Sequence, residues 1–171
     1  WEFLVDVLKM DPDRLYVTVF EQDEEAARLW AERVPSLGEK GRIVSFGDED
    51  NYWPAGSALP TWSGPNGPCS EIHYDFGEDK CPFPKKCRLP GEHDCERFRE
   101  FWNLVFPQFV RTADGKNPPM ERPGIDTGLG FERLVAILQG KDTIFDTDLF
   151  VPYFRRLGGL FRRPDGGDED A

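Results

Sequence analysis

The hydrophobic pattern predicts a helix, a strand and a second helix at the start of the chain. Apolar residues recur at helical spacing within residues 1–10, and Asp11-Pro12 ends that pattern. Residues 14–20 alternate in the manner of a strand that is covered on both faces. Residues 23–34 return to helical spacing, with acidic residues in the first turn, where the helix dipole favours them.

The rest of the chain alternates short strand patterns with long polar segments. Strands are predicted at residues 43–46, 71–74 and 101–110, and a helix at residues 130–138 with Gly140 as its C-terminal signal. Residues 48–70 are rich in Gly, Pro, Ser and Asn, which predicts a long surface loop, and residues 79–96 form a second irregular insert. Pro107 has no backbone N–H, so it predicts a bulge or an edge position within 101–110.

These strands and helices do not alternate regularly around Gly-rich turns. The pattern therefore predicts an α+β fold, with an antiparallel β-sheet flanked by helices. We expect residues 1–158 to form the folded part, with inserts at 48–70 and 79–96. Residues 159–171 are expected to form an acidic, Gly-rich linker or tail.

Composition narrows the possible functions. A chain of 171 residues with 39% apolar content can bury one core, so a globular domain or a piece of one is expected. The net charge of -11 ranks a generic nucleic-acid-binding domain last, because such binding depends on clustered Lys and Arg. No run of the sequence has the length of a membrane span, and we expect a cytoplasmic protein without a membrane partner. The chain opens in mid-helix without Met, so we expect it to be cut from something longer.

Three of the four cysteines lie close together beside a histidine. Cys81, Cys87, His93 and Cys95 are a tetrahedral zinc set by ligand type, although their spacing is not that of paired CxxC knuckles. The alternative is a solvated loop with incidental cysteines. Zinc is favoured because exposed thiols without a purpose are a liability in a cytosolic protein.

The most specific segment is GIDTGLGFER at residues 124–133, in which three glycines surround Asp126 and lead into a helix. Glycine permits close backbone approach to a ligand, and a helix N-terminus attracts phosphate. Arg133, one turn into the helix, can stack on a base or hold phosphate. Taken alone, the glycines could instead mark a tight strand-to-helix turn.

This segment resembles the third signature of class II aminoacyl-tRNA synthetases, in its alanyl version. Five further blocks follow in the order of that family, and the resemblance extends to about residue 154. The blocks are VTVFE at 17–21, DNYW at 50–53, GPCSEI at 67–72, WNLVF at 102–106 and FDTDLF at 145–150. The chain departs from the family at residues 54–66, which are longer than usual, and at Asn66, where a Cys is common. The resemblance implies that residues 1–158 are the second half of the catalytic domain.

The resemblance also implies an alanine site. Asp126 would receive the α-ammonium, although by itself it could be the N-cap of the following helix. Gly128 would form a wall of the side-chain pocket. Asn103 and Val105 lie two apart on a strand and face one side, although cross-strand pairing and core packing could also explain them. Trp53 would close over the methyl group as an apolar lid.

An ATP site is implied in the same way. Gly128, Gly130 and Arg133 would contact the adenylate or the phosphates. Glu71 would help to hold magnesium, which prefers a few carboxylates together with phosphate oxygens. Asp75 is an equally charged neighbour and could serve instead.

The implied reaction begins when the alanine carboxylate attacks the α-phosphorus of ATP and releases pyrophosphate; alanine is then transferred to tRNA(Ala). Asp126 and Arg133 would be the catalytic residues, acting by positioning and charge stabilisation without a protein nucleophile. The second class II signature, whose arginine grips the α-phosphate, should lie upstream of Trp1. We therefore expect this segment to be inactive alone and to need the upstream and downstream parts of the same synthetase.

A different class of function remains open. The chain could be a non-catalytic, synthetase-like module with a structural zinc insert and a relic pocket. The intact Asp126, Asn103, Val105 and Arg133 argue against such decay.

Overall fold

The computed structural model describes residues 1–56 and 58–160 of the 171-residue chain. The chain divides into two compact units, the first over Trp1–Gly130 and the second beginning at Phe131. No helix in the described ranges combines the length and the apolar character needed to cross a membrane.

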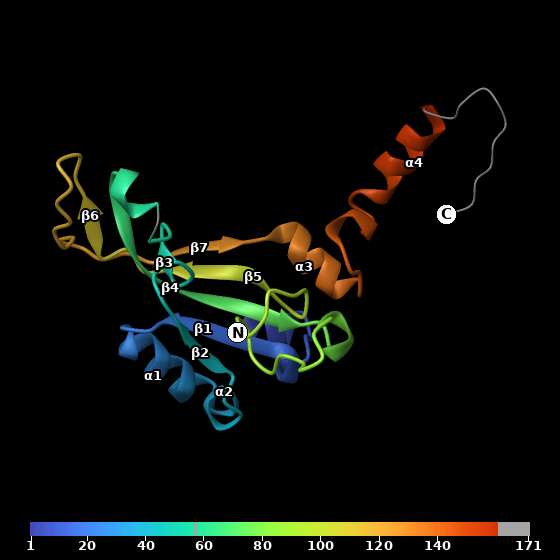
Figure 1. Ribbon diagram of the computed structural model, residues 1–171, viewed down its shortest axis with the longest axis horizontal. Helices are drawn as coiled ribbons and strands as arrows, with labels where there is room; N and C mark the ends of the chain where they lie inside the picture. Colours follow the sequence, from blue (N-terminus) through green and yellow to red (C-terminus); the bar gives the residue numbers. More distant parts are fainter. Residues whose placement is uncertain (57, 161–171) are drawn as a thin grey trace. The chain divides into compact units, whose positions relative to one another are not determined.

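A seven-stranded sheet organises the first unit (Figure 1). Its strands are β1 (Leu15–Phe20), β2 (Ile43–Phe46), β3 (Tyr52–Trp53), β4 (Gly64–Asp75), β5 (Phe98–Val105), β6 (Phe109–Arg111) and β7 (Asp126–Leu129). The order is β2-β1-β4-β5-β7, and β3 and β6 both pair with β4. The predicted α+β fold is confirmed. One detail differs, because β1 and β2 pair in parallel while the other pairs are antiparallel.

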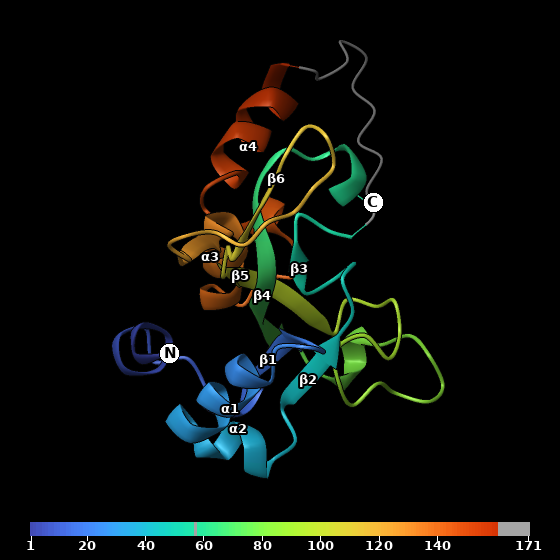
Figure 2. The ribbon, with the colours of Figure 1, turned by 90° about the vertical axis from the view of Figure 1, so that its left-hand side faces the viewer.

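Two helices lie beside β1 and β2 (Figure 2) and cover their apolar side chains. The helical elements of the first unit are η1 (Phe3–Val7), η2 (Pro12–Arg14), α1 (Glu24–Arg33), α2 (Pro35–Glu39), η3 (Leu59–Thr61) and η4 (Glu78–Lys80). The predicted helix at 23–34 is confirmed as α1, which begins where the Asp23 carboxylate accepts a hydrogen bond from the Ala26 N–H at 2.9 Å. Val17 and Val19 of β1 pack against Leu37 of α2 in one buried core.

The predicted loop at 48–70 is wrong over much of its length. β4 begins at Gly64 and runs for 12 residues, so it extends seven residues before the predicted strand at 71–74. Pro65 and Pro68 are tolerated because the partner strand changes along β4: β6 pairs with residues 64–66, β3 with residues 67 and 68, and β1 and β5 with the rest. The Gly- and Pro-rich composition of residues 64–70 predicted a loop. Pairing with strands elsewhere in the sequence instead holds their backbone extended.

The predicted strand at 101–110 is interrupted at Pro107. β5 ends at Val105 and β6 starts at Phe109, and the two strands pair with different parts of β4. The irregularity predicted from the missing N–H is confirmed as a break between two strands.

Gly67 of β4 is required because the backbone between β5 and β6 passes very close to it. A Cβ atom at Gly67 would lie 2.3 Å from the Phe106 carbonyl oxygen and 3.0 Å from the Gln108 nitrogen. Both groups belong to backbone that is fixed by hydrogen bonds, from Phe106 N to Pro68 O and from Gln108 N to Asn66 O. The backbone therefore cannot move away at little cost.

We expect Gly67→Ala to lower the free energy of unfolding by roughly 2–4 kcal/mol, the range of overpacked and strained sites. Thermal unfolding of the complete protein measures the change. Gly47→Ala is the matched control, because a Cβ atom there would meet nothing within 4 Å. Equal melting temperatures for the two variants would contradict the argument from close approach.

The second unit contains α3 (Phe131–Leu138), η5 (Ile144–Asp146) and α4 (Val151–Leu160). Gly140, with φ of 61°, ends α3 as predicted, and the Lys141 N–H donates to the Ala136 carbonyl at 2.8 Å. α4 continues through Leu160, so residues 159 and 160 of the predicted linker or tail are helical. Residues 161–171 lie outside the described residues.

Candidate functional site

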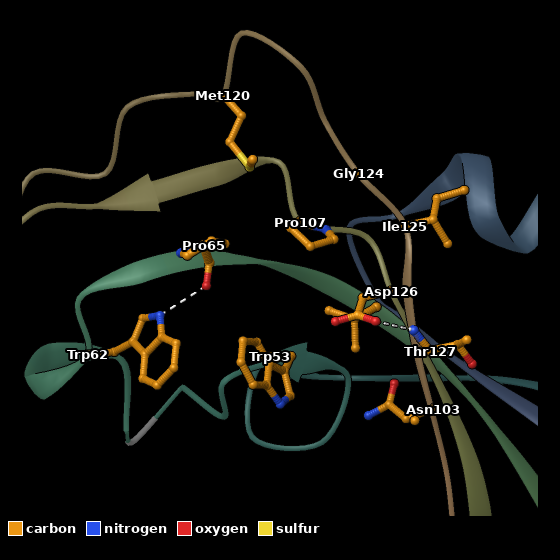
Figure 3. Close-up of a pocket in the computed structure, with 12 residues that line it drawn as sticks. Trp53, Trp62, Pro65, Asn103, Pro107, Met120, Gly124, Ile125, Asp126 and Thr127 are labelled. Atoms are coloured by element: carbon orange, nitrogen blue, oxygen red, sulfur yellow. Dashed lines mark hydrogen bonds between the residues drawn. The ribbon is translucent and has the colours of Figure 1, made fainter.

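A cavity of about 600 Å³ opens in the first unit, at the end of the sheet where β3, β5 and β7 meet the segment after β6 (Figure 3). This volume lies within the range of roughly 300–1,000 Å³ that is usual for small-molecule sites. All five residues predicted to bind alanine contribute to its lining, namely Trp53, Asn103, Val105, Asp126 and Gly128.

Strand pairing explains why four of these residues are neighbours. In the β5–β7 ladder, Asn103 lies opposite Gly128 and Val105 lies opposite Asp126. Residues two apart on a strand face the same side, so both pairs face the cavity. The spacing of Asn103 and Val105 predicted their common face, whereas the register against β7 could not be obtained from spacing. A Cβ atom placed at Gly128 would have no other atom within 4 Å. The space beside this glycine therefore belongs to the open cavity.

The Asn103 side chain presents a buried oxygen without a partner. Its Nδ2 donates to Glu71 Oε1 at 3.3 Å, while Oδ1 is buried and accepts no hydrogen bond from the described residues. Buried polar atoms are nearly always paired, and an unpaired one costs about 1–3 kcal/mol. An N–H donor of a ligand in the cavity would satisfy this oxygen.

Asp126 lies at the exposed start of β7, which is the edge strand of the sheet. It starts β7, five residues before α3, so it is not the N-cap of that helix. Its carboxylate accepts a hydrogen bond from the Thr127 N–H at 2.8 Å, which fixes one oxygen and leaves the other at the cavity rim (Figure 3).

Trp53 lies in a short strand rather than in a loop. β3 pairs Trp53 with Gly67, and the indole is 40% exposed. Its ring meets the Trp62 ring edge to face at a centroid distance of 5.1 Å, and the Trp62 Nε1–H donates to the Pro65 carbonyl at 2.9 Å. The two tryptophans thus form a supported apolar wall of the cavity (Figure 3).

Sequence reasoning missed several lining residues. Trp62 had a signal, since a large aromatic residue stands in a segment otherwise made of small and turn-forming residues. Gly124, Ile125 and Thr127 belong to the motif at 124–133, but no individual role was predicted for them. Pro65, Pro107 and Met120 carry no local pattern that marks a site. Asn66, where the family often has a Cys, is fully buried and bonds to Tyr52 and Asn117, so it supports the strands behind the cavity.

Behind Asn103, a chain of polar side chains orients Glu71. The second Glu71 oxygen, Oε2, lies 3.3 Å from His73 Nε2, which also lies 3.3 Å from the Thr18 hydroxyl. Asn51 Nδ2 donates to that hydroxyl at 2.9 Å. His73, which the sequence left as an ordinary strand side chain, therefore helps to fix the carboxylate predicted to hold magnesium.

Asp75, the alternative magnesium ligand, is already paired. Arg97 donates to both of its oxygens, at 2.9 and 2.8 Å, in a bidentate ion pair. Both Glu71 oxygens also have neighbours, Asn103 Nδ2 and His73 Nε2, but neither neighbour is a guanidinium. The role of Glu71 toward magnesium stays a prediction.

Cys69 lies opposite Val105 in the β4–β5 ladder. Burial, and then the nearby Glu71 carboxylate, raise the pKa of the Cys69 thiol to about 12. The thiol therefore stays protonated near neutral pH and acts as a packing group rather than as a nucleophile.

The remaining ATP residues lie where the first unit passes into the second. The Gly130 N–H donates to the Phe101 carbonyl at 2.8 Å, which anchors the end of the first unit to β5. Arg133 lies in α3 of the second unit. The roles of both residues toward ATP stay predictions.

The predicted zinc residues lie together in the irregular insert between η4 and β5. Ligand atoms of Cys81, Cys87 and His93 are all within 4.8 Å of one another. Cys95 is outside this group of three, but its sulfur lies 3.4 Å from that of Cys87.

Comparisons with known proteins identify the family of this chain. Residues 1–167 match the family described as tRNA synthetases class II (A), and the chain belongs to this family. The resemblance inferred from the sequence blocks is thereby confirmed.

Individual relatives narrow the similarity to one member of this class. The chain is 48% identical over 160 residues to alanine–tRNA ligase of Campylobacter jejuni subsp. jejuni. The matched region covers 94% of this chain and 18% of that protein. It is 45% identical over 160 residues to alanine–tRNA ligase of Chlorobium luteolum, which covers 94% of the chain and 17% of that protein. The chain thus spans less than a fifth of the length of these curated relatives.

Proposed function

We propose that this chain supplies the alanine pocket and part of the ATP site of a longer cytoplasmic enzyme, an alanine–tRNA ligase. That enzyme would activate alanine with ATP and transfer it to tRNA(Ala). The observation that carries the proposal is that the five residues predicted to bind alanine all line one cavity. One of them, Asn103, has a buried side-chain oxygen without a hydrogen-bond partner among the described residues. The similarity to alanine–tRNA ligases supports the same assignment.

Recognition of alanine follows from the chemistry of the lining. The free Asp126 oxygen would bind the α-ammonium through a charge-assisted hydrogen bond. Asn103 Oδ1 is a second acceptor for the same group. Val105 and Trp53 offer apolar surfaces to the methyl group and exclude larger side chains, while Gly128 leaves space for the adenylate.

Catalysis would rest on placement. The alanine carboxylate oxygen attacks the α-phosphorus and pyrophosphate leaves, so a single displacement suffices and no protein nucleophile is needed. Arg133 and the backbone at Gly128 and Gly130 would hold the nucleotide.

Magnesium fits the Glu71 carboxylate by donor chemistry, since this ion prefers carboxylate and phosphate oxygens. His73 and Asn103 already fix the orientation of that carboxylate. When bound, the ion would neutralise charge on the phosphates.

Alanine-dependent pyrophosphate exchange tests the proposal. We expect exchange by the complete protein and none above background by the 171-residue segment, because no arginine in this sequence matches the second class II signature. Exchange by the isolated segment would show that it holds a complete site.

Binding of alanyl-sulfamoyl-adenosine to the complete protein separates the two functional hypotheses. An enzyme should bind this adenylate analogue and show exchange. Failure of both would favour the non-catalytic, synthetase-like module.

A further inference from the structure

We propose that Cys81, Cys87, His93 and Cys95 bind one structural zinc ion, which fixes residues 76–97 to the end of the sheet. The proposal rests on the geometry of the insert and is independent of the alanine site.

The distances between ligand atoms suit a tetrahedral zinc ion. With Zn–S about 2.3 Å and Zn–N about 2.0 Å, two sulfurs at the tetrahedral angle lie about 3.8 Å apart, and a sulfur and a nitrogen about 3.5 Å apart. The Cys81 sulfur lies 3.7 Å from His93 Nδ1, and the Cys87 and Cys95 sulfurs lie 3.4 Å apart. Cys95 lies outside the group whose ligand atoms are all within 4.8 Å, so binding of one ion requires its sulfur to move closer to Cys81 or His93.

The insert has almost no core apart from these thiols. Cys81 and Cys87 are 0% and 1% exposed, whereas Lys85 and Arg88 nearby are exposed. A short segment with so little apolar burial needs a disulfide, a metal ion or a similar cross-link to hold one conformation. Burial of two thiols at its centre indicates that they are the cross-linking groups.

The surroundings of the cluster match its expected charge. Three thiolates and a neutral imidazole around Zn²⁺ leave a net charge of minus one. Lys86 Nζ donates to the Cys81 carbonyl, which places a cation beside the cluster. The Phe83 ring packs against the His93 ring at a centroid distance of 4.5 Å, tilted by 37°, and restricts its orientation. A protein that supplies all four ligands leaves no open position, so the site would be structural rather than catalytic.

Arg97 connects the cluster to the sheet. Its Nη1 donates to the Cys87 carbonyl at 2.5 Å. Its Nε and Nη2 donate to the two carboxylate oxygens of Asp75, at the end of β4. On the opposite side, Gly91 approaches Phe46 of β2 so closely that a Cβ atom would lie 2.5 Å from the ring. Zinc would therefore order an insert that contacts both β2 and β4.

The first test is the metal content of freshly purified complete protein, after dialysis against a weak chelator. We expect one zinc ion per chain, and loss of this zinc in Cys87→Ser. Cys69→Ser is the matched control, because it removes the one cysteine outside the cluster and should leave this zinc in place. If the complete protein binds zinc elsewhere as well, the measured quantity is the difference in zinc content per chain between Cys69→Ser and Cys87→Ser.

A second measurement guards against a Cys87→Ser variant that fails to fold. Trypsin should cleave the native protein at Lys85 and Arg88 faster after zinc is removed with a strong chelator, and added zinc should restore protection. Absence of zinc, equal zinc in both variants, or a Cys87–Cys95 disulfide in protein purified without reductant would each overturn the proposal.

Discussion

Asp126→Asn is expected to lower kcat/KM for alanine in pyrophosphate exchange by roughly 10- to 100-fold. A hydrogen bond to a charged group contributes about 1.5–3 kcal/mol, and each 1.4 kcal/mol is a factor of ten. Asparagine keeps the shape of the side chain and can still accept from the Thr127 N–H, so only the negative charge is lost. The melting temperature should therefore stay unchanged, which separates loss of binding from loss of fold.

Glu121→Gln is the matched control for this variant. Glu121 is an exposed carboxylate in the segment that leads into β7 and is not part of the cavity lining. The same change from carboxylate to amide should leave exchange unaffected there. Equal activity of Asp126→Asn and the unaltered protein would mean that another group receives the α-ammonium.

Arg97→Met is expected to lower the free energy of unfolding by roughly 3–5 kcal/mol. Arg97 and Asp75 form an ion pair whose side chains are 10% and 13% exposed, and removal of one partner leaves an uncompensated carboxylate with little access to water. The Cys87 carbonyl would lose its donor at the same time. Thermal unfolding of the complete protein, followed with and without zinc, measures the loss.

Two further variants decide whether charge is the cause. Arg88→Met removes an exposed arginine from the same insert and should change stability by no more than about 0.5 kcal/mol. Adding Asp75→Asn to Arg97→Met removes the stranded charge and should recover part of the lost stability. No recovery in the double variant would show that packing, rather than the ion pair, determines the effect.

Local sequence patterns predicted the elements that depend on local interactions. α1 carries its own cap at Asp23 and an apolar stripe, and β1 is buried or half-buried on both faces, so both lie close to their predicted ranges. Most of β4 was missed, because its first residues are rich in Gly and Pro. These residues are extended because they pair with β3, which precedes them in the sequence, and with β6, which follows them.

The candidate site shows the same division. The motif around Asp126 and the strand spacing of Asn103 and Val105 pointed to the residues that line one cavity. The network through His73 and Thr18 was invisible, because it joins strands whose register is set by the whole sheet. Trp62 likewise gained its place through a contact with Trp53 and a bond to Pro65.

The β4–β5 connection leaves the sheet after Asp75 and returns at Phe98, while the opposite end of the same strand pair holds Cys69 and Val105. Cross-strand pairs fix the register of a hairpin, and lengthening its turn adds little closure entropy. This connection can thus gain or lose residues during evolution without displacing Glu71 or Asn103. It is also a suitable point to insert a foreign peptide as a reporter while the opposite end of the sheet keeps its geometry.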